Sequence, residues 1–312
     1  MYGAIIGDVV GSKYEFNNIK TKDFPMLSEG CTFTDDTVMT IAVARALMRS
    51  REKKINFQEI LIDEMQYLGI KYPDGSYGLS FSQWLQTKHP KPYNSFGNGS
   101  AMRVSPCGLI AVEIGEALSL AKASAEVTHN HPEGIKGAQA VAGAIFFAKT
   151  GKTIIKTNFY DLEETLEEIR PKYYFNETCQ ETVPQAIQAF LESDDFEDAI
   201  RNAVSLGGDS DTLAAITGSI AWVYYGCYRR FELLTEKDNS PFLDKIKKLL
   251  PIEFVETIQE FAKTCIGRNG TYYRVGSCSQ IPHRVNEGRG VQFTLSPKLI
   301  CQAYGILWTE KL

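Results

Sequence analysis

Two clusters of acidic and hydroxyl side chains each stand directly before an apolar run of the sequence. The first is residues 34–37 (Thr-Asp-Asp-Thr), and the second is residues 207–212 (Gly-Gly-Asp-Ser-Asp-Thr). Their oxygens are hard ligands that suit Mg²⁺, Mn²⁺ or Ca²⁺ better than zinc, which prefers nitrogen and sulfur. Adjacent carboxylates repel each other unless a cation lies between them. The two clusters therefore predict one shared site with two divalent ions, which we favour over two independent helix caps.

Each cluster must be carried by a helix that begins beside it. Gly207 and Gly208 let the backbone turn where a Cβ would clash, so the acids after them can converge at the start of a helix over residues 213–225. Residues 38–47 follow the first cluster in the same way and have the pattern of an amphipathic helix. Periodicity alone does not show whether the two helices meet.

Five short motifs in a fixed order carry a family resemblance. They are residues 3–12 (GAIIGDVVGS), 33–39 (FTDDTVM), 97–103 (GNGSAMR), 128–129 (TH) and 205–212 (SLGGDSDT). Together they resemble the ADP-ribosylglycohydrolase family, which includes the dinitrogenase reductase-activating glycohydrolase and the ADP-ribosyl-acceptor hydrolases. We therefore expect a catalytic domain over residues 1–265 and a C-terminal extension of unknown role over residues 266–312.

The resemblance implies a site with two Mg²⁺ ions, with Mn²⁺ as a substitute. One ion would be held by Thr34, Asp35, Asp36 and Asp211, and the other by Asp209, Asp211 and Thr212, with Glu15 as a further ligand. Asp35, Asp36 and Glu15 are the expected catalytic residues, and either Asp36 or Glu15 would be the general base. Without the resemblance, Glu15 would be interpreted as a solvated carboxylate at the end of a helix.

Two loops rich in Gly, Ser and Asn, residues 71–78 and 93–100, expose backbone N–H groups that can hold a diphosphate, although they could equally be connectors. The resemblance places Tyr77 and Gly78 in the substrate-phosphate loop. It places Phe96, which would stack on adenine, in the adenosine-side wall together with Ser95 and Gly97, and Asn98 is a further expected substrate-binding residue.

The histidine pair at residues 129 and 131 is a further candidate site. By resemblance, His129 contacts the diphosphate or the ribose; the alternative is that it caps the helix before it. A zinc site is not expected there, because the two histidines do not share a helix face and no third soft ligand is near.

The implied activity is hydrolysis of the bond between ADP-ribose and its acceptor, which passes through an oxocarbenium-like state. Tyr77–Gly78, residues 95–99 and Glu15 resemble family members that act on O-linked ADP-ribose: serine conjugates, poly(ADP-ribose), O-acetyl-ADP-ribose or ADP-ribose 1″-phosphate. ADP-ribosyl-arginine is the alternative, because Asp74 could reach a guanidinium. A non-catalytic ADP-ribose reader and a crystallin-like structural protein are two more hypotheses, and the complete set of acids and threonines argues against both.

Composition and charge indicate which classes of binding partner are expected. The net charge of −5 and scattered Lys and Arg disfavour nucleic acid, and 44% hydrophobic residues are enough for a sizeable core. Seven widely spaced cysteines without a Cys-x-x-Cys motif, and an N-terminus without a basic region, favour a cytoplasmic protein. Apolar runs over residues 138–148 and 213–228 are shorter than the roughly 20 residues of a membrane span. We expect a monomer that binds an ADP-ribosylated protein or a small ADP-ribose conjugate and no membrane.

Clear strand patterns are absent through residue 265, which predicts an all-α fold. The resemblance implies a compact orthogonal bundle of many helices. Small residues at helical spacing in residues 3–11 predict close packing against another helix. Further helices are expected over residues 55–68, 81–85, 101–111, 116–127, 138–149, 159–169, 185–191 and 195–206, with two more within 241–265. The tail over residues 266–312 has a β or loop pattern and could form a small appendage.

Overall fold

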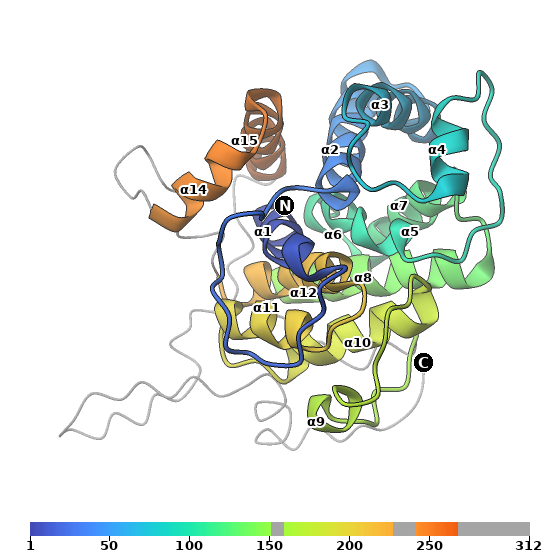
Figure 1. Cartoon of the computed structure of the whole chain (residues 1–312). Helices are drawn as coiled ribbons and strands as arrows, with labels where there is room; N and C mark the ends of the chain where they lie inside the picture. Colours follow the sequence, from blue (N-terminus) through green and yellow to red (C-terminus); the bar gives the residue numbers. More distant parts are fainter. Residues whose placement is uncertain (151–158, 227–240, 268–312) are drawn as a thin grey trace.

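Helix α1 (Tyr2–Gly11) packs along α12 (Ser210–Tyr224) near the middle of the fold (Figure 1). Their backbones approach so closely that a Cβ on Gly7 would lie 2.0 Å from the carbonyl oxygen of Ala214. A Cβ on Gly3 would lie 2.2 Å from the carbonyl oxygen of Gly218. The small residues of the first helix therefore serve close helix packing, as their spacing predicts.

The computed structural model describes residues 1–150, 159–226 and 241–267. These residues form an all-α fold without a β-strand; an isolated bridge joins Gly97 to Thr178. The predicted fold class is confirmed. Among the described helices, none has both the length and the hydropathy to cross a membrane. Besides α1 and α12, the helical elements are η1 (Ser12–Tyr14), α2 (Asp35–Lys53), α3 (Phe57–Lys71), α4 (Leu79–Leu85), α5 (Gly99–Met102), α6 (Ser105–Ile110), α7 (Ile114–Glu126), α8 (Pro132–Thr150), α9 (Leu166–Ile169), α10 (Cys179–Leu191), α11 (Phe196–Ser205), α14 (Pro241–Leu249) and α15 (Ile252–Gly267).

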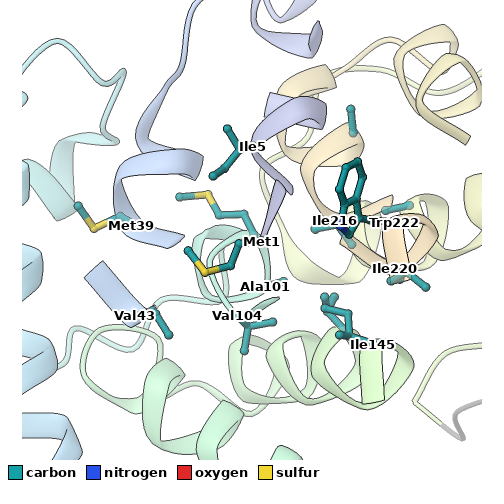
Figure 2. Close-up of a cluster of buried hydrophobic side chains, with 14 of the residues drawn as sticks. Met1, Ile5, Met39, Val43, Ala101, Val104, Ile145, Ile216, Ile220 and Trp222 are labelled. Atoms are coloured by element: carbon teal, nitrogen blue, oxygen red, sulfur yellow. The ribbon is translucent and has the colours of Figure 1, made fainter. Parts of the chain in front are cut away.

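The core joins helices that are far apart in the sequence. Figure 2 shows Ile5 of α1, Met39 of α2, Ile145 of α8 and Ile216 of α12 around a shared interior, and each of the four is 0% exposed. Burial of apolar side chains such as these is the main stabilising term of the fold. The same core fixes the N-termini of α2 and α12, where the two acidic clusters lie.

Helices α14 and α15 belong to the same packed body. Phe254 is 0% exposed, and its ring centroid lies 5.6 Å from that of Phe33 and 4.8 Å from that of Tyr72. Arg45 of α2 reaches Glu253 at 3.6 Å. Helix α15 therefore supports the chain directly before α2.

Two helix predictions are wrong. The segment 159–169 is helical only over α9, because Thr165 and Glu168 form a capping box that starts the helix there. The segment 101–111 is divided into α5 and α6, because Pro106 opens α6 and cannot continue a helix from the preceding turn.

Helix α10 is longer than the predicted 185–191, since it begins at Cys179 and continues through Pro184. The predicted tail appendage lies outside the described residues from residue 268 onward. The domain boundary at residue 265 stays a prediction.

Candidate active site

A tight turn delivers the second acidic cluster to the start of α12. Gly207 and Gly208 have φ values of +69° and +75°, in the left-handed region that favours glycine. Asn18 clamps this turn: its Oδ1 accepts from the Gly208 N–H at 2.7 Å, and its Nδ2 donates to the Gly208 carbonyl at 2.9 Å. Asp209 occupies the N-cap position of α12, but its side chain makes no capping hydrogen bond. Its carboxylate is therefore available to another partner.

At the start of α2 the capping role is taken by a threonine. Thr34 is the N-cap residue, and its Oγ1 accepts from the Asp36 N–H at 3.3 Å. Asp35 and Asp36 follow in the first turn, where the helix dipole favours negative charge. The Asp35 N–H donates to the Gly75 carbonyl at 2.7 Å, which ties the loop before α4 to this helix end.

The two helix ends meet, which the sequence pattern leaves open. Thr212 of α12 donates from Oγ1 to Asp36 Oδ2 of α2 at 3.1 Å. Carboxylate oxygens of Glu15, Asp209 and Asp211 all lie within 4.8 Å of one another. Within the described ranges, these three residues form a group whose carboxylate oxygens are close enough together to bind one metal ion. Asp35 and Asp36 stand at the start of α2, outside this group of three carboxylates.

Asp8 is a site residue that the sequence reasoning missed. It is 0% exposed, and its carboxylate accepts from the backbone N–H and the hydroxyl of both Thr34 and Thr37. Because the Thr34 hydroxyl donates its proton to Asp8, that oxygen can offer only lone pairs elsewhere, as a metal ligand must. The available signal was an aspartate inside an otherwise apolar helix.

Burial makes the negative charges of the site unfavourable. It raises the pKa of Asp8 to about 6. Burial, together with the charge of Asp209, raises the pKa of Glu15 to about 7. The pKa values of Asp35, Asp36 and Asp211 also lie well above the usual range, because the groups are buried and repel one another. Among the described residues, no Lys or Arg forms a salt bridge with any of these carboxylates.

The donor set fits divalent cations. Asp36 Oδ1 is buried without a hydrogen-bond partner in the part of the chain that is described. A buried carboxylate oxygen in that state, among like charges that lack a counter-ion, is stabilised by a cation. Carboxylate and hydroxyl oxygens are the ligands that Mg²⁺ and Mn²⁺ prefer.

The loop at residues 95–98 is attached to the acidic cluster. Asn98 Nδ2 donates to Asp209 Oδ2 at 2.6 Å and to Thr182 Oγ1 at 3.1 Å. Beside it, the Phe96 side chain is 45% exposed, and its ring centroid lies 5.3 Å from that of His131. Gly97 pairs with Thr178, so the loop is held from both sides.

The other predicted substrate loop meets the cluster from the side of α2. Gly78 is the N-cap residue of α4, and the half-buried Tyr77 donates its hydroxyl to the Tyr72 carbonyl at 2.9 Å. Gly75 connects this loop to Asp35 through the backbone hydrogen bond described above. Tyr77 and Gly78 therefore lie close to the first acidic cluster, and their role in binding stays a prediction.

His129 is buried beside the Gly97–Gly99 segment. It is 5% exposed, and its Nδ1 lies 2.7 Å from Thr128 Oγ1. Its backbone N–H donates to the Ala125 carbonyl at 2.7 Å, so the backbone and not the imidazole closes the end of α7. A Cβ on Gly99 would lie 3.2 Å from His129 Nε2, so the ring faces the Gly97–Gly99 segment. This arrangement differs from the predicted alternative of a side-chain cap.

Comparison with known proteins gives the family. The model of the ADP-ribosylglycohydrolase family matches residues 1–229. The chain belongs to this family. It is an enzyme that hydrolyses glycosyl bonds of ADP-ribose. This finding disagrees with the two alternative hypotheses, a non-catalytic reader and a structural protein.

Relatives of this ADP-ribosylglycohydrolase include human ADP-ribosylhydrolase ARH3, which is 27% identical over 72% of this chain and 84% of the human protein. An uncharacterized protein of Archaeoglobus fulgidus is 32% identical over 70% of this chain and 84% of its own length. ADP-ribosylarginine hydrolase Tri1 of Serratia proteamaculans is 24% identical over 79% of this chain and 74% of its own length.

The fold of this ADP-ribosylglycohydrolase is also similar to a solved structure. That structure is an ADP-ribosylglycohydrolase-related protein complex with a TM-score of 0.58 and 21% identity, covering 88% of this chain and 95% of the other. The residues matched to the family include both acidic clusters and both predicted substrate loops.

Proposed function

We propose that this ADP-ribosylglycohydrolase is a Mg²⁺-dependent hydrolase that removes O-linked ADP-ribose from serine or from a related conjugate. The observation that carries the metal dependence is the convergence of buried carboxylates at two helix ends, none of which forms a salt bridge with a Lys or Arg among the described residues. The relative named ADP-ribosylhydrolase ARH3, and the loop motifs around Tyr77 and Phe96, favour the O-linked acceptor over arginine.

The proposed ligands are the six residues of the two clusters, with Glu15 beside them. When bound, Mg²⁺ would act as a Lewis acid toward the oxygens of the ribose. Asp8 fixes the hydroxyl of Thr34, and Asn98 fixes the carboxylate of Asp209 by its 2.6 Å hydrogen bond. These contacts hold the ligand oxygens in place before the substrate arrives, which limits the reorganisation that the reaction requires. The proposed ligand set is Thr34, Asp35, Asp36, Asp209, Asp211 and Thr212.

Glu15 is the stronger of the two candidates for the general base. Its carboxyl is half-buried next to Asp209 and Asp211, so water can reach it. A carboxylate that contacts the attacking water can accept its proton. Asp36 is buried and already accepts from Thr212, which leaves it less free to exchange a proton with water.

The exposed Phe96 side chain would supply a stacking surface for adenine. The backbone groups of residues 95–98, which include Ser95 and Gly97, would contact the rest of the ligand. Arginine-linked ADP-ribose is the second candidate substrate. Asp74 is exposed next to Gly75, whose carbonyl accepts from Asp35, so a carboxylate stands close to the acidic cluster. The name of the Serratia relative also refers to this linkage. The monomeric state and the cytoplasmic location stay predictions.

The decisive assay measures ADP-ribose release from matched serine-linked and arginine-linked peptides, with Mg²⁺ and with EDTA. Mg²⁺-dependent release from the serine peptide alone is the expected result. Release from the arginine peptide alone would contradict the O-linked acceptor, and equal release in EDTA would contradict the metal dependence. Asp35→Ala and Asp211→Ala should each fold and lose turnover by at least about 100-fold; an active, metal-free Asp211→Ala protein would overturn the ligand assignment.

A further inference from the structure

Arg103 is a buried charge that the proposed reaction does not use. It follows the last residue of α5 and is 1% exposed. Its Nη2 donates to the Ser124 carbonyl and to Thr128 Oγ1, both at 2.8 Å. In the described part of the chain, no carboxylate lies within salt-bridge distance of it. Burying a guanidinium that is bound only to neutral oxygens costs free energy.

The hydroxyl of Thr128 lies between Arg103 and His129. It is 0% exposed and has two polar neighbours among the described residues, Arg103 Nη2 at 2.8 Å and His129 Nδ1 at 2.7 Å. A guanidinium can only donate, so Thr128 Oγ1 accepts from Arg103. The hydroxyl proton then needs an acceptor, and His129 Nδ1 is the neighbour that can provide one.

The opposite tautomer would leave a buried group without a partner. If His129 carried its proton on Nδ1, that N–H would donate to Thr128, and the hydroxyl proton of Thr128 would have no acceptor among the described residues. An unsatisfied buried donor of this kind is strongly disfavoured. The proton of the imidazole is therefore placed on Nε2.

The Nε2 edge of the imidazole is directed at the predicted substrate loop. His129 Nε2 is 3.5 Å from the position of a Cβ on Gly97 and 3.2 Å from that of a Cβ on Gly99. No described residue hydrogen-bonds to Nε2, and this nitrogen is not one of the buried atoms left without a partner, so water or a ligand oxygen can accept from it. Burial and the charge of Arg103 hold the pKa of His129 well below its usual range, so the ring is neutral.

We propose that Arg103 and Thr128 are positioning residues that hold His129 as a neutral imidazole protonated on Nε2, which donates a hydrogen bond to an oxygen of ADP-ribose at the Gly97–Gly99 segment. The identity of the ligand rests on the proposed function, whereas the tautomer does not. A donor whose tautomer and orientation are fixed in advance needs no reorganisation when the ligand binds. The two glycines leave the ligand oxygen room to approach.

The tautomer can be measured directly on the ligand-free wild-type protein. With ¹⁵N-labelled histidine, long-range ¹H–¹⁵N correlation spectra at pH 7 distinguish a protonated from an unprotonated ring nitrogen, and His129→Asn assigns the signal among the four histidines. The expected spectrum has an unprotonated Nδ1 and a protonated Nε2. A proton on Nδ1, or on both nitrogens, would overturn the proposal.

Variants test the two positioning residues through Thr128. Thr128→Val should shift the two nitrogen signals toward each other and raise the Kd for ADP-ribose roughly fivefold, the effect of one hydrogen bond. Thr128→Ser should restore both. Thr217→Val is the matched control, because Thr217 is equally buried and donates to the Ala186 carbonyl instead. Unchanged signals and Kd in Thr128→Val would refute the role of Thr128.

Failure of this inference can be separated from failure of the proposed function. If the expected tautomer is found but neither peptide releases ADP-ribose, the proposed function is wrong and the tautomer assignment stands. If ADP-ribose is released but its binding leaves the Nε2 signal of His129 unmoved, the proposed hydrogen bond to the ligand is wrong.

Discussion

Metal-free protein should lose stability as the pH rises from 5 to 8. The folded protein holds the pKa of Asp8 at about 6 and that of Glu15 at about 7, against usual values of 3.8 and 4.5. Because these folded-state values lie above the unfolded ones, the folded protein binds protons more tightly. The resulting stabilisation is complete below about pH 4 and is lost as the pH rises through 6 and 7.

The magnitude follows from Asp8, which is 0% exposed. A change in pKa from 3.8 to about 6, at about 1.4 kcal/mol for each tenfold change in proton affinity, corresponds to about 3 kcal/mol. Of this, about 1 kcal/mol is still present at pH 5 and is lost by pH 8. Glu15, Asp35, Asp36 and Asp211 shift in the same direction, so this loss is a lower bound.

The assay is urea unfolding at pH 5, 6.5 and 8, with EDTA and with Mg²⁺. Mg²⁺ should remove most of the decline, since an ion that binds only the folded protein stabilises it and replaces the protons. Asp211→Asn should raise the stability of metal-free protein at pH 8 and weaken the response to Mg²⁺. Asp63→Asn, an exposed acid on α3, is the matched control and should keep the wild-type slope.

Two results would refute this reasoning. A free energy of unfolding that is constant or rises between pH 5 and 8 in the metal-free protein would show that burial and mutual repulsion do not raise the pKa values of the site acids. A full response to Mg²⁺ in Asp211→Asn would show that Asp211 does not hold the ion, even if the pH dependence is as expected.

Three further substitutions test the fold and the support of the site. Gly7→Ala should destabilise the protein by about 3 kcal/mol or more, because the new Cβ would lie 2.0 Å from the Ala214 carbonyl oxygen; Gly143→Ala, with its nearest neighbour at 3.6 Å, should instead be neutral or stabilise by up to about 1 kcal/mol in the same urea titration. Asn98→Ala removes the 2.6 Å hydrogen bond to Asp209 and should lower kcat/KM at least about tenfold, with Thr217→Val as the unaffected control in steady-state kinetics. Phe254→Ala should cost about 3–5 kcal/mol of unfolding free energy, since the ring is 0% exposed against Phe33 and Tyr72; a small effect would show that α15 does not belong to the core.

Most of the detail that could be predicted from the sequence was local. Gly207 and Gly208 needed positive φ, and both have it, because that requirement is set by the turn itself. The segment 159–169 was predicted wrongly, since its pattern suits a helix but Thr165 and Glu168 start one only at Leu166. Both outcomes depend on a few neighbouring residues. In the second case the helical pattern of residues 159–169 and the capping box at Thr165 and Glu168 indicate different helix starts, and the capping box determines the start.

What could not be predicted depended on which helices lie side by side. Asp8 reads as one acid in an apolar helix, and only the passage of α1 beside the start of α2 shows that it accepts four hydrogen bonds from Thr34 and Thr37. The relay from Arg103 through Thr128 to His129 likewise joins the end of α5 to the end of α7. Neither arrangement leaves a periodic signal in the chain.

The packing of α1 on α12 connects the fold to the chemistry of the site. Gly11 ends α1, and a Cβ there would lie 2.5 Å from the Cα of Asp211. The missing side chain lets the backbone that continues to Glu15 approach the start of α12, so the oxygens of Glu15, Asp209 and Asp211 come within 4.8 Å of one another. Bringing three carboxylates so close opposes folding unless protons or a cation are present. The glycine contacts along this helix pair stabilise the fold that brings these carboxylates together. The repulsion among the carboxylates favours the binding of a cation between them.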